Sequence, residues 1–190
     1  MFIAKCQHNH NKLLKNCFSY LYCSTLNYDI ISLAIDGGLI YRRVLNMKKS
    51  YFYKTYKDLK FKEGFSLLPV LHHPKSRGQI KLKSRDPLKP PAIFANYLSE
   101  RSDVETLLKG IKECIRIGET YPFKRYGAKF YSRPNPICKK YHTPFSDKYW
   151  ECVARHFTYH VYHDVGTCRM GPIDDPLGAV VDDRCTFHKL

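Results

Sequence analysis

Two histidines, a thiol and two glycines lie within the twelve-residue segment His160-Val-Tyr-His-Asp-Val-Gly-Thr-Cys-Arg-Met-Gly171. An imidazole exchanges protons near neutral pH, so a histidine just before a Gly-Thr turn has the chemistry of a general base. The turn would hold the backbone while the ring projects into a cleft. A single histidine is nevertheless more often structural than catalytic. The residue types alone therefore leave both roles of His163 open.

A resemblance favours the catalytic role. The pattern Tyr162-His163-x-Val-Gly-Thr-Cys-x-Met-Gly-Pro172 resembles the signature near the C-terminus of glucose-methanol-choline (GMC) flavoprotein oxidoreductases, in particular the insect FAD-dependent glucose dehydrogenase branch. In that family the matching histidine accepts the hydroxyl proton of the substrate while hydride passes to the flavin. The resemblance thus implies His163 as the catalytic base, FAD as cofactor, and an alcohol or sugar as substrate. Asp164 replaces the family's usual proline, and a carboxylate beside the base tends to raise the histidine's pKa.

The resemblance extends over residues 29–190. It includes a Ser-Leu-Ala-x-Asp-Gly-Gly passage within residues 29–40, a His-Pro-Lys-Ser-Arg-Gly-x-Ile-x-Leu run that ends at Leu82, and an Ala-Val-Val-Asp passage that ends at Asp182. It implies an α+β substrate domain with a mostly antiparallel sheet backed by helices. We accordingly divide the chain into an unmatched leader (1–28), a lead-in (29–64), the substrate domain (65–172) and a truncated return strand (173–190).

Two parts of the family pattern are missing. No Gly-x-Gly-x-x-Gly follows a strand anywhere in the sequence, so the loop that cradles the flavin pyrophosphate is absent. The His or Asn that the family pairs with the base, about forty residues further on, would lie beyond Leu190. We therefore expect the FAD domain to be largely absent and assign no cofactor-binding residue. The alternative to a working fragment is an inactive remnant, or an incomplete gene model, that binds no flavin.

Composition narrows the remaining classes of function. A hydrophobic share of 44%, with 14% aromatic residues, is typical of a chain with a packed core. The formal charge of +15 comes from lysines and arginines spread along the chain, without a nucleic-acid-binding motif, so we predict no specific nucleic-acid partner. No long uncharged apolar run is present, which predicts no membrane span. Oligomeric state and localisation stay open.

Local patterns predict the elements that carry the motif. Apolar residues at helical spacing predict a helix over 46–61 capped by Asn46, a second from Ser102 to Gly118, and a third that starts at Ser146. A Ser102–Glu105 capping box would begin the second helix. Cys114 falls on its apolar stripe and is expected to be buried there, as is Trp150 on the third helix.

Extended segments are expected between the first two helices. The apolar run 65–71 and the alternating run 79–83 predict two strands, which the bend at Pro74 and Gly78 would join as a hairpin. His72 and His73 then lie in a turn. The proline-rich segment 86–93 is expected to be an extended connector.

The possible metal ligands have unfavourable spacing. Cys138, His142, Cys152 and His156 have the residue types of a zinc site, but the Cys-x3-His pairs are unlike those of zinc fingers. His156, His160 and His163 share helical spacing, yet the β-branched and aromatic run that follows predicts that the helix ends near Thr158 and separates the rings. We therefore predict no metal site.

Overall fold

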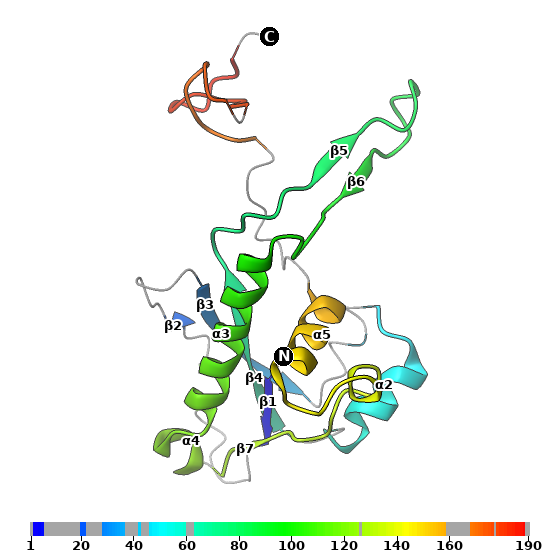
Figure 1. Cartoon of the computed structure of the whole chain (residues 1–190), viewed down its shortest axis with the longest axis vertical. Helices are drawn as coiled ribbons and strands as arrows, with labels where there is room; N and C mark the ends of the chain where they lie inside the picture. Colours follow the sequence, from blue (N-terminus) through cyan, green and yellow to red (C-terminus); the bar gives the residue numbers. More distant parts are fainter. Residues whose placement is uncertain are drawn as a thin grey trace. The chain divides into compact units, whose positions relative to one another are not determined.

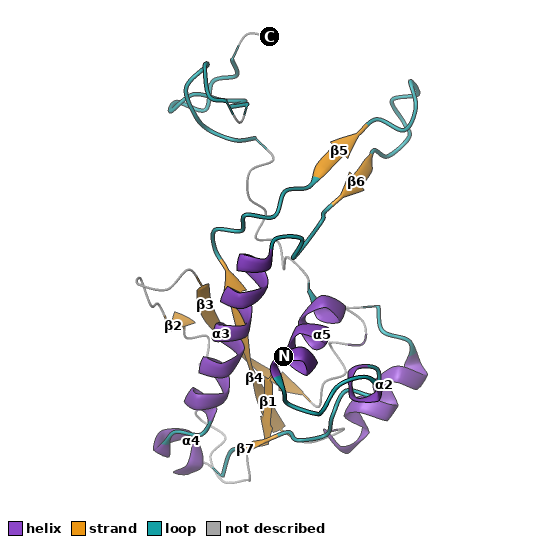
Figure 2. Ribbon diagram, in the orientation of Figure 1, coloured by secondary structure: helices purple, strands orange, loops and turns teal. Residues whose placement is uncertain are grey.

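A computed structural model describes residues 2–5, 20–21, 28–36, 42, 46–59, 63–125, 127–158, 168–176 and 178–188. The chain forms two compact units, residues 1–157 and 158–190. We call them unit 1 and unit 2 and describe each by itself. Unit 1 contains an antiparallel sheet backed by helices, which confirms the predicted α+β class (Figures 1 and 2).

The main sheet of unit 1 has five strands in the order β2-β3-β4-β1-β7, and every pairing in it is antiparallel. Its strands are β1 (Phe2–Lys5), β2 (Tyr20–Leu21), β3 (Tyr28–Asp36), β4 (Glu63–Leu71) and β7 (Lys129–Phe130). The two long strands, β3 and β4, pair along their whole length, from Tyr28 opposite Leu71 to Asp36 opposite Glu63. They form the centre of the sheet on which the helices pack.

Strand β4 is the buried strand that the apolar run predicted. Phe65 and Leu67 point to the same face and pack against Cys114 of the long helix, and Leu67 is completely buried. Pro69 lies opposite Ile30 of β3 and beyond Leu67, where the pairing of β4 with β1 ends.

Helix α3 (Arg101–Gly118) packs across this sheet (Figure 1). Its buried residues follow the predicted stripe and include Cys114, which is only 1% exposed. The predicted capping box is wrong: the helix begins at Arg101, Ser102 lies inside its first turn, and Glu105 instead pairs with Arg101 at 3.2 Å. The (i, i+4) ion pair is available because the helix starts early.

Helix α2 (Lys49–Tyr56) and the short 3-10 helix η2 (Lys57–Leu59) occupy the first predicted helical region. Asn46 does not cap α2, because its backbone is left-handed (φ 47°) and the capping position falls at Lys48. Phe52, the most buried residue of α2, packs with Tyr56 and Leu59.

The remaining helices of unit 1 are α4 (Tyr121–Arg125), η3 (Cys138–Lys140) and α5 (Asp147–Phe157). Helix α5 begins where predicted, since Ser146 Oγ accepts a hydrogen bond from Tyr149 N at 3.2 Å. It packs on α3 through Trp150 and Val153, and Trp150 is 6% exposed, as expected of a core residue. Its end at Phe157 confirms that the helix stops before His160.

Strands β5 (Gln79–Lys81) and β6 (Ala92–Phe94) form a separate two-stranded sheet. The predicted hairpin between 65–71 and 79–83 is therefore wrong. The chain instead reverses at Asp86-Pro87. There Asp86 Oδ1 accepts a hydrogen bond from Leu88 N, and the carbonyl oxygen of Asp86 accepts one from Lys89 N. An Asp-Pro turn of this kind favours reversal more strongly than the earlier bend. The expected connector 86–93 therefore contains this turn, and its last two residues begin strand β6.

In unit 2 the structure describes residues 158, 168–176 and 178–188, and this part contains turns and isolated bridges at Val181. Within the described part of the chain, no helix has the length and apolarity needed to cross a membrane.

Candidate functional site

The predicted base, His163, lies outside the described residues, as does His160. The structure describes the chain on both sides of it, up to Thr158 and again from Cys168. The role of His163 therefore stays a prediction, and the flanking segments show how the motif is held.

The downstream flank is fixed by backbone hydrogen bonds. Val180 N donates to Arg169 O at 2.7 Å, and Gly171 N donates to Val181 O at 3.0 Å. His188 Nε2 donates to Gly171 O at 2.9 Å. The Cys-Arg-Met-Gly end of the motif is thus held against the segment around Val181.

Gly171 is required by close packing in this flank. A Cβ atom at this position would lie 2.6 Å from Asp175 Oδ2 and 3.2 Å from Ala179 Cβ. Moving Asp175 Oδ2 aside would disturb its ion pair with Arg169 Nη1, which has a length of 2.5 Å. The second glycine of the motif, Gly171, therefore leaves the space that Asp175 and Ala179 occupy.

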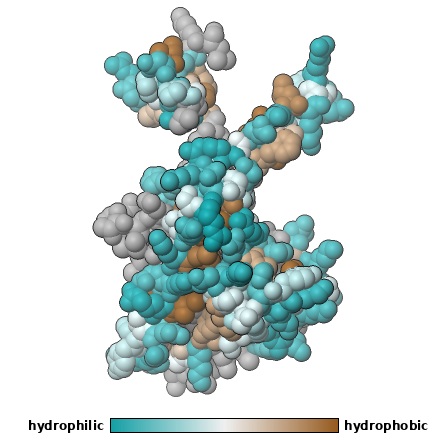
Figure 3. Space-filling view, in the orientation of Figure 1, coloured by the Kyte–Doolittle hydropathy of each residue, from teal (hydrophilic) through white to brown (hydrophobic). Residues whose placement is uncertain are grey.

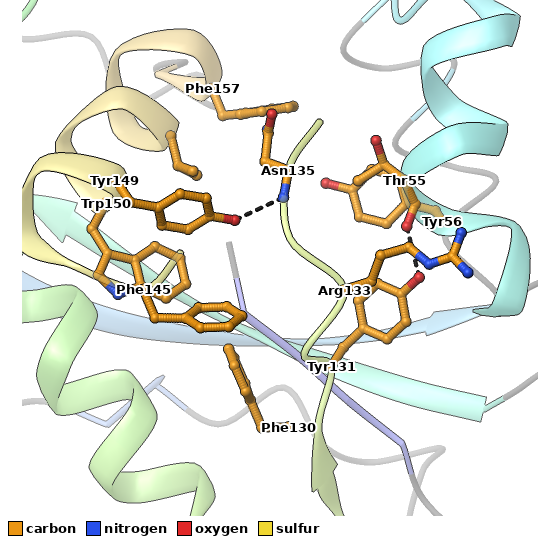
Figure 4. Close-up of a pocket in the computed structure, with 11 residues that line it drawn as sticks. Thr55, Tyr56, Phe130, Tyr131, Arg133, Asn135, Phe145, Tyr149, Trp150 and Phe157 are labelled. Atoms are coloured by element: carbon orange, nitrogen blue, oxygen red, sulfur yellow. Dashed lines mark hydrogen bonds between the residues drawn. The ribbon is translucent and has the colours of Figure 1, made fainter. Parts of the chain in front are cut away.

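The upstream flank, Phe157, lines a cavity in unit 1 between α2, α5 and the loop after β7 (Figure 4). The cavity has a volume of about 40 Å³. Its lining is mostly aromatic: Thr55, Tyr56, Phe130, Tyr131, Arg133, Asn135, Phe145, Tyr149, Trp150, Val153 and Phe157. A space of this size has room for about one to three water molecules.

Asn135 organises the polar groups of this aromatic cavity. Its backbone N–H donates to Tyr149 Oη at 2.7 Å, and its Nδ2 donates to Tyr51 Oη at 2.6 Å. Its Oδ1 accepts from Ile137 N at 2.9 Å and from Cys138 N at 3.3 Å. Asn135 thereby joins the loop after β7 to α2 through its side chain and to α5 through its backbone.

The tyrosines around the cavity stay protonated at neutral pH. Burial raises the pKa of Tyr51 to about 12, although hydrogen bonds with Thr55 and Asn135 lower it in part. Burial also raises the pKa of Tyr131 to about 12, and that of Tyr149 above its ordinary value. These hydroxyl groups can donate hydrogen bonds but cannot act as bases near pH 7.

Two of the four residues considered as zinc ligands are joined to each other. Cys138 and Cys152 form a disulfide, which links η3 to α5. His156 lies beside it, with Nδ1 3.7 Å from Cys152 Sγ and 2.8 Å from Cys152 O. Cys138, Cys152 and His156 are the group of possible metal ligands among the described residues. In the disulfide, however, the two sulfur atoms are bonded to each other and are not thiolate ligands. The sequence reasoning missed this disulfide, because cysteine spacing does not determine pairing.

A buried carboxylate that the sequence reasoning also missed lies at the start of α3. Asp103, 3% exposed, accepts hydrogen bonds from Lys75 N at 2.9 Å, Ser76 N at 2.7 Å and Ser76 Oγ at 2.6 Å. Burial by itself would raise the pKa of Asp103, but these hydrogen bonds outweigh it and hold the pKa below the ordinary value of 3.8. The sequence feature that could have indicated this role is the position of Asp103, an acidic residue in the first turn of α3.

Comparison with known proteins connects these segments to a family. A family model described as GMC oxidoreductase, covering the C-terminal part of such proteins, matches residues 74–190. The chain is 46% identical over 125 residues to "Glucose dehydrogenase [FAD, quinone]" of Drosophila pseudoobscura pseudoobscura, a match covering 66% of this chain and 20% of that protein. The protein of the same name from Drosophila melanogaster is 44% identical over 127 residues, which cover 67% of this chain and 20% of that protein.

A bacterial protein is similar over almost the same extent. "Alcohol dehydrogenase [acceptor]" of Pseudomonas putida is 39% identical over 115 residues, covering 59% of this chain and 18% of that protein. The chain therefore spans about a fifth of the length of the curated relatives that it matches.

Proposed function

Since the chain belongs to the GMC oxidoreductase family, we propose that it is the C-terminal part of an FAD-dependent oxidoreductase acting on the CH–OH group of an alcohol or sugar. The observation that carries this proposal is the family match over residues 74–190, which contains the complete His163 motif. The names of these relatives, glucose dehydrogenase and alcohol dehydrogenase, both indicate oxidation of a CH–OH group.

In the proposed reaction His163 accepts the proton of the substrate hydroxyl group. The carbon-bound hydrogen leaves with its electron pair, and the C–O single bond becomes a carbonyl. Two electrons and one proton thus pass to an acceptor, and the other proton stays on the imidazole. The contribution of this chain is the base and the framework that positions it.

The aromatic cavity among the described residues is not a flavin site. The cavity beside α5 measures about 40 Å³, far less than a flavin ring system needs, and its lining offers neutral hydroxyl groups and one arginine. That arginine, Arg133, is already paired with Asp58 at 2.5 Å. The sequence also lacks the glycine-rich loop that binds a dinucleotide pyrophosphate. We therefore derive no step through the flavin.

The described residues on either side of the motif are each fixed within their own unit. Helix α5 of unit 1 ends at Phe157, and in unit 2 Gly171 is held by hydrogen bonds with His188 and Val181.

Substitution in a hybrid enzyme tests the proposal. Residues 74–190 would replace the matching segment of Drosophila melanogaster glucose dehydrogenase, and substrate oxidation would be followed with a dye acceptor. We expect oxidation by the hybrid, and a loss of roughly 10²–10⁴-fold in rate for His163→Gln with flavin content unchanged. The matched control is His156→Gln, an exposed histidine on α5, which should oxidise substrate like the unsubstituted hybrid. Equal loss in both variants would refute His163 as the base.

A second candidate, an inactive remnant that binds no flavin, is favoured by the missing glycine-rich loop and the small cavity. It predicts that the purified 190-residue chain retains no flavin absorbance after incubation with FAD. Stoichiometric retention of FAD would rule this candidate out. A colourless chain that also yields an inactive hybrid would favour the inactive remnant over the oxidoreductase.

A further inference from the structure

A cysteine–histidine cluster in unit 1 has the donor atoms of a zinc site. Large apolar side chains stand out on β5 and β6 (Figure 3), but neither strand contains a cysteine, a histidine or a carboxylate. A group of possible ligands lies instead on η3 and α5, where the donor atoms of Cys138, Cys152 and His156 are within 4.8 Å of one another. We call these three residues the CCH cluster. It gains thiol ligands only when the disulfide is reduced.

Helix α5 positions two of the three ligands. Cys152 and His156 are four residues apart, so their side chains project from one face of the helix. Cys152 Sγ lies 3.7 Å from His156 Nδ1. In a tetrahedral zinc site, with Zn–S of about 2.3 Å and Zn–N of about 2.0–2.1 Å, a sulfur ligand and a nitrogen ligand are about 3.6 Å apart. One edge of the tetrahedron is therefore already present in the oxidised protein.

The third ligand is held near α5 by contacts that do not involve sulfur. Cys138 N donates to Asn135 Oδ1 at 3.3 Å, and Asn135 N donates to Tyr149 Oη of α5 at 2.7 Å. His142 N donates to Cys138 O at 3.0 Å. These hydrogen bonds should keep η3 beside α5 after reduction. The two sulfur atoms then need to move apart only to about 3.8 Å, their separation in a tetrahedral zinc site.

The exposure of the CCH cluster admits both a reductant and a metal ion. Cys138 is completely buried, Cys152 is half-buried and His156 is exposed, so a reductant would reach the disulfide at Cys152. Zn²⁺ would take the place of the hydrogen that His156 Nδ1 donates to Cys152 O at 2.8 Å, and Nε2 would carry that hydrogen instead. Among the described residues no fourth side chain belongs to the cluster, so a water molecule would complete the coordination.

We propose that reduction of the Cys138–Cys152 disulfide creates a zinc site formed by both thiolates, His156 and one water molecule. A dithiol can reduce the disulfide: two electrons and two protons pass to the chain, the S–S bond breaks, two thiols form, and the dithiol becomes a disulfide. Zn²⁺ then binds as both thiols release their protons to solvent. The sequence predicted no metal site because the spacing is unlike that of zinc fingers, but the fold brings Cys138 to a helical Cys-x3-His pair.

Zinc also solves a charge problem in the reduced chain. A thiolate at the completely buried Cys138 would be costly without a positive partner. The double charge of Zn²⁺ supplies that partner and deprotonates a coordinating thiol. The bound metal would restore the link between η3 and α5 that the disulfide provides in the oxidised chain.

Cobalt(II), a spectroscopic substitute for zinc, tests the proposal on the 190-residue chain. A phosphine reduces the disulfide without offering thiols to the metal; water gives its oxygen to the phosphine and its two hydrogens to the sulfurs. In the reduced chain we expect Co²⁺ to produce thiolate-to-metal charge-transfer bands and the ligand-field bands of a tetrahedral site, and Zn²⁺ to abolish them. Cys152→Ser should remove these bands, and His156→Gln should weaken Zn²⁺ binding roughly tenfold or more.

Two matched controls remove the same groups outside the CCH cluster. They are Cys168→Ser, at an exposed free cysteine of unit 2, and His142→Gln, at the histidine four residues after Cys138. Both variants should bind Zn²⁺ within about threefold of the unsubstituted chain. Bands of equal strength in Cys152→Ser and the unsubstituted chain would overturn the proposal. So would bands that are equally strong before and after reduction.

Thermal unfolding followed by Trp150 fluorescence covers the case in which reduction destabilises unit 1. Zn²⁺ at about 100 times its dissociation constant should raise the melting temperature of the reduced chain by roughly 5–10 °C. It should not change that of the oxidised chain or of reduced Cys152→Ser. Absence of a shift in the reduced chain would contradict the proposal. The hybrid assay of substrate oxidation keeps the disulfide intact, so His156 holds no metal there and His156→Gln stays a neutral change.

Discussion

Replacing Asp103 with alanine should destabilise unit 1, because this buried carboxylate joins the start of α3 to the segment before β5. It accepts three hydrogen bonds, two from the backbone N–H groups of Lys75 and Ser76 and one from the Ser76 hydroxyl. Ser76 Oγ in turn accepts a hydrogen bond from Glu100 N at 3.1 Å. Alanine removes the acceptor at the centre of this network.

The magnitude follows from the hydrogen bonds. A hydrogen bond to a charged group contributes about 1.5–3 kcal/mol, but these three share one carboxylate and the freed N–H groups near the surface regain some water. We therefore expect a loss of about 3 kcal/mol in the free energy of unfolding. For a chain of this size each kcal/mol shifts the melting temperature by about 2–4 °C, so the variant should melt roughly 6–12 °C lower.

Trp150 provides the assay. It is the only tryptophan, it is buried in unit 1, and its helix packs on α3. Its fluorescence during urea unfolding would therefore report the free energy of unfolding of the unit that contains Asp103. The control is Asp147→Asn, which removes an exposed ion pair with Lys112 and should cost about 1 kcal/mol or less.

The dependence on pH provides an independent check. The pKa of Asp103 is lowered in the folded state, so its stabilisation is fully present above the ordinary value of 3.8 and is lost as the pH falls through the lowered value. The difference between the unsubstituted chain and Asp103→Ala should be constant from about pH 7 to pH 5 and shrink below about pH 4. A loss no larger than that of Asp147→Asn, or a difference that grows in acid, would refute this reasoning.

Three further perturbations have defined outcomes. Replacing Cys138 and Cys152 with serine should lower the free energy of unfolding by about 3 kcal/mol, as expected for a loop of about 15 residues, and mass spectrometry of the unreduced protein should find a peptide pair linked through these positions; two free thiols there would contradict the disulfide. Asn135→Ala should cost about 2–3 kcal/mol by Trp150 fluorescence, since it leaves Ile137 N, Cys138 N and Tyr51 Oη without their partner; a change below about 0.5 kcal/mol would show that water replaces the amide. Gly171→Ala should displace the Asp175 carboxylate and destabilise unit 2 by about 1–3 kcal/mol, seen as faster hydrogen exchange over residues 168–188; unchanged exchange there would mean that the flank has room for a methyl group.

Local patterns predicted the helices of unit 1 well. The apolar stripe through Val104, Leu108 and Cys114 and the one through Trp150 and Val153 repeat with the helical period, and that period is a property of adjacent residues. Their ends were less predictable. Ser102 has the residue type of a cap, yet α3 already begins at Arg101, because tertiary contacts decide between neighbouring starting points.

Contacts between distant residues were beyond the reach of the sequence. Strand β4 pairs with β3 and β1 and not with the strand that follows it, and no local signal distinguishes these partners. The Asp103 network joins residues 27 and 28 positions apart, and Asn135 reaches Tyr51 across 84 positions. The candidate base, by contrast, was recognised from a short contiguous motif, which is why His163 could be named from the sequence and its partners could not.

The pH dependence of substrate oxidation by the hybrid enzyme, measured with and without His163→Gln, tests the central claim most directly. With His163 present, the rate should fall in acid, because a protonated imidazole cannot accept the hydroxyl proton of the substrate. The glutamine variant should be slow by roughly 10²-fold or more and should lack this pH dependence. A glutamine variant that keeps both the full rate and the same pH profile would show that another group accepts the proton.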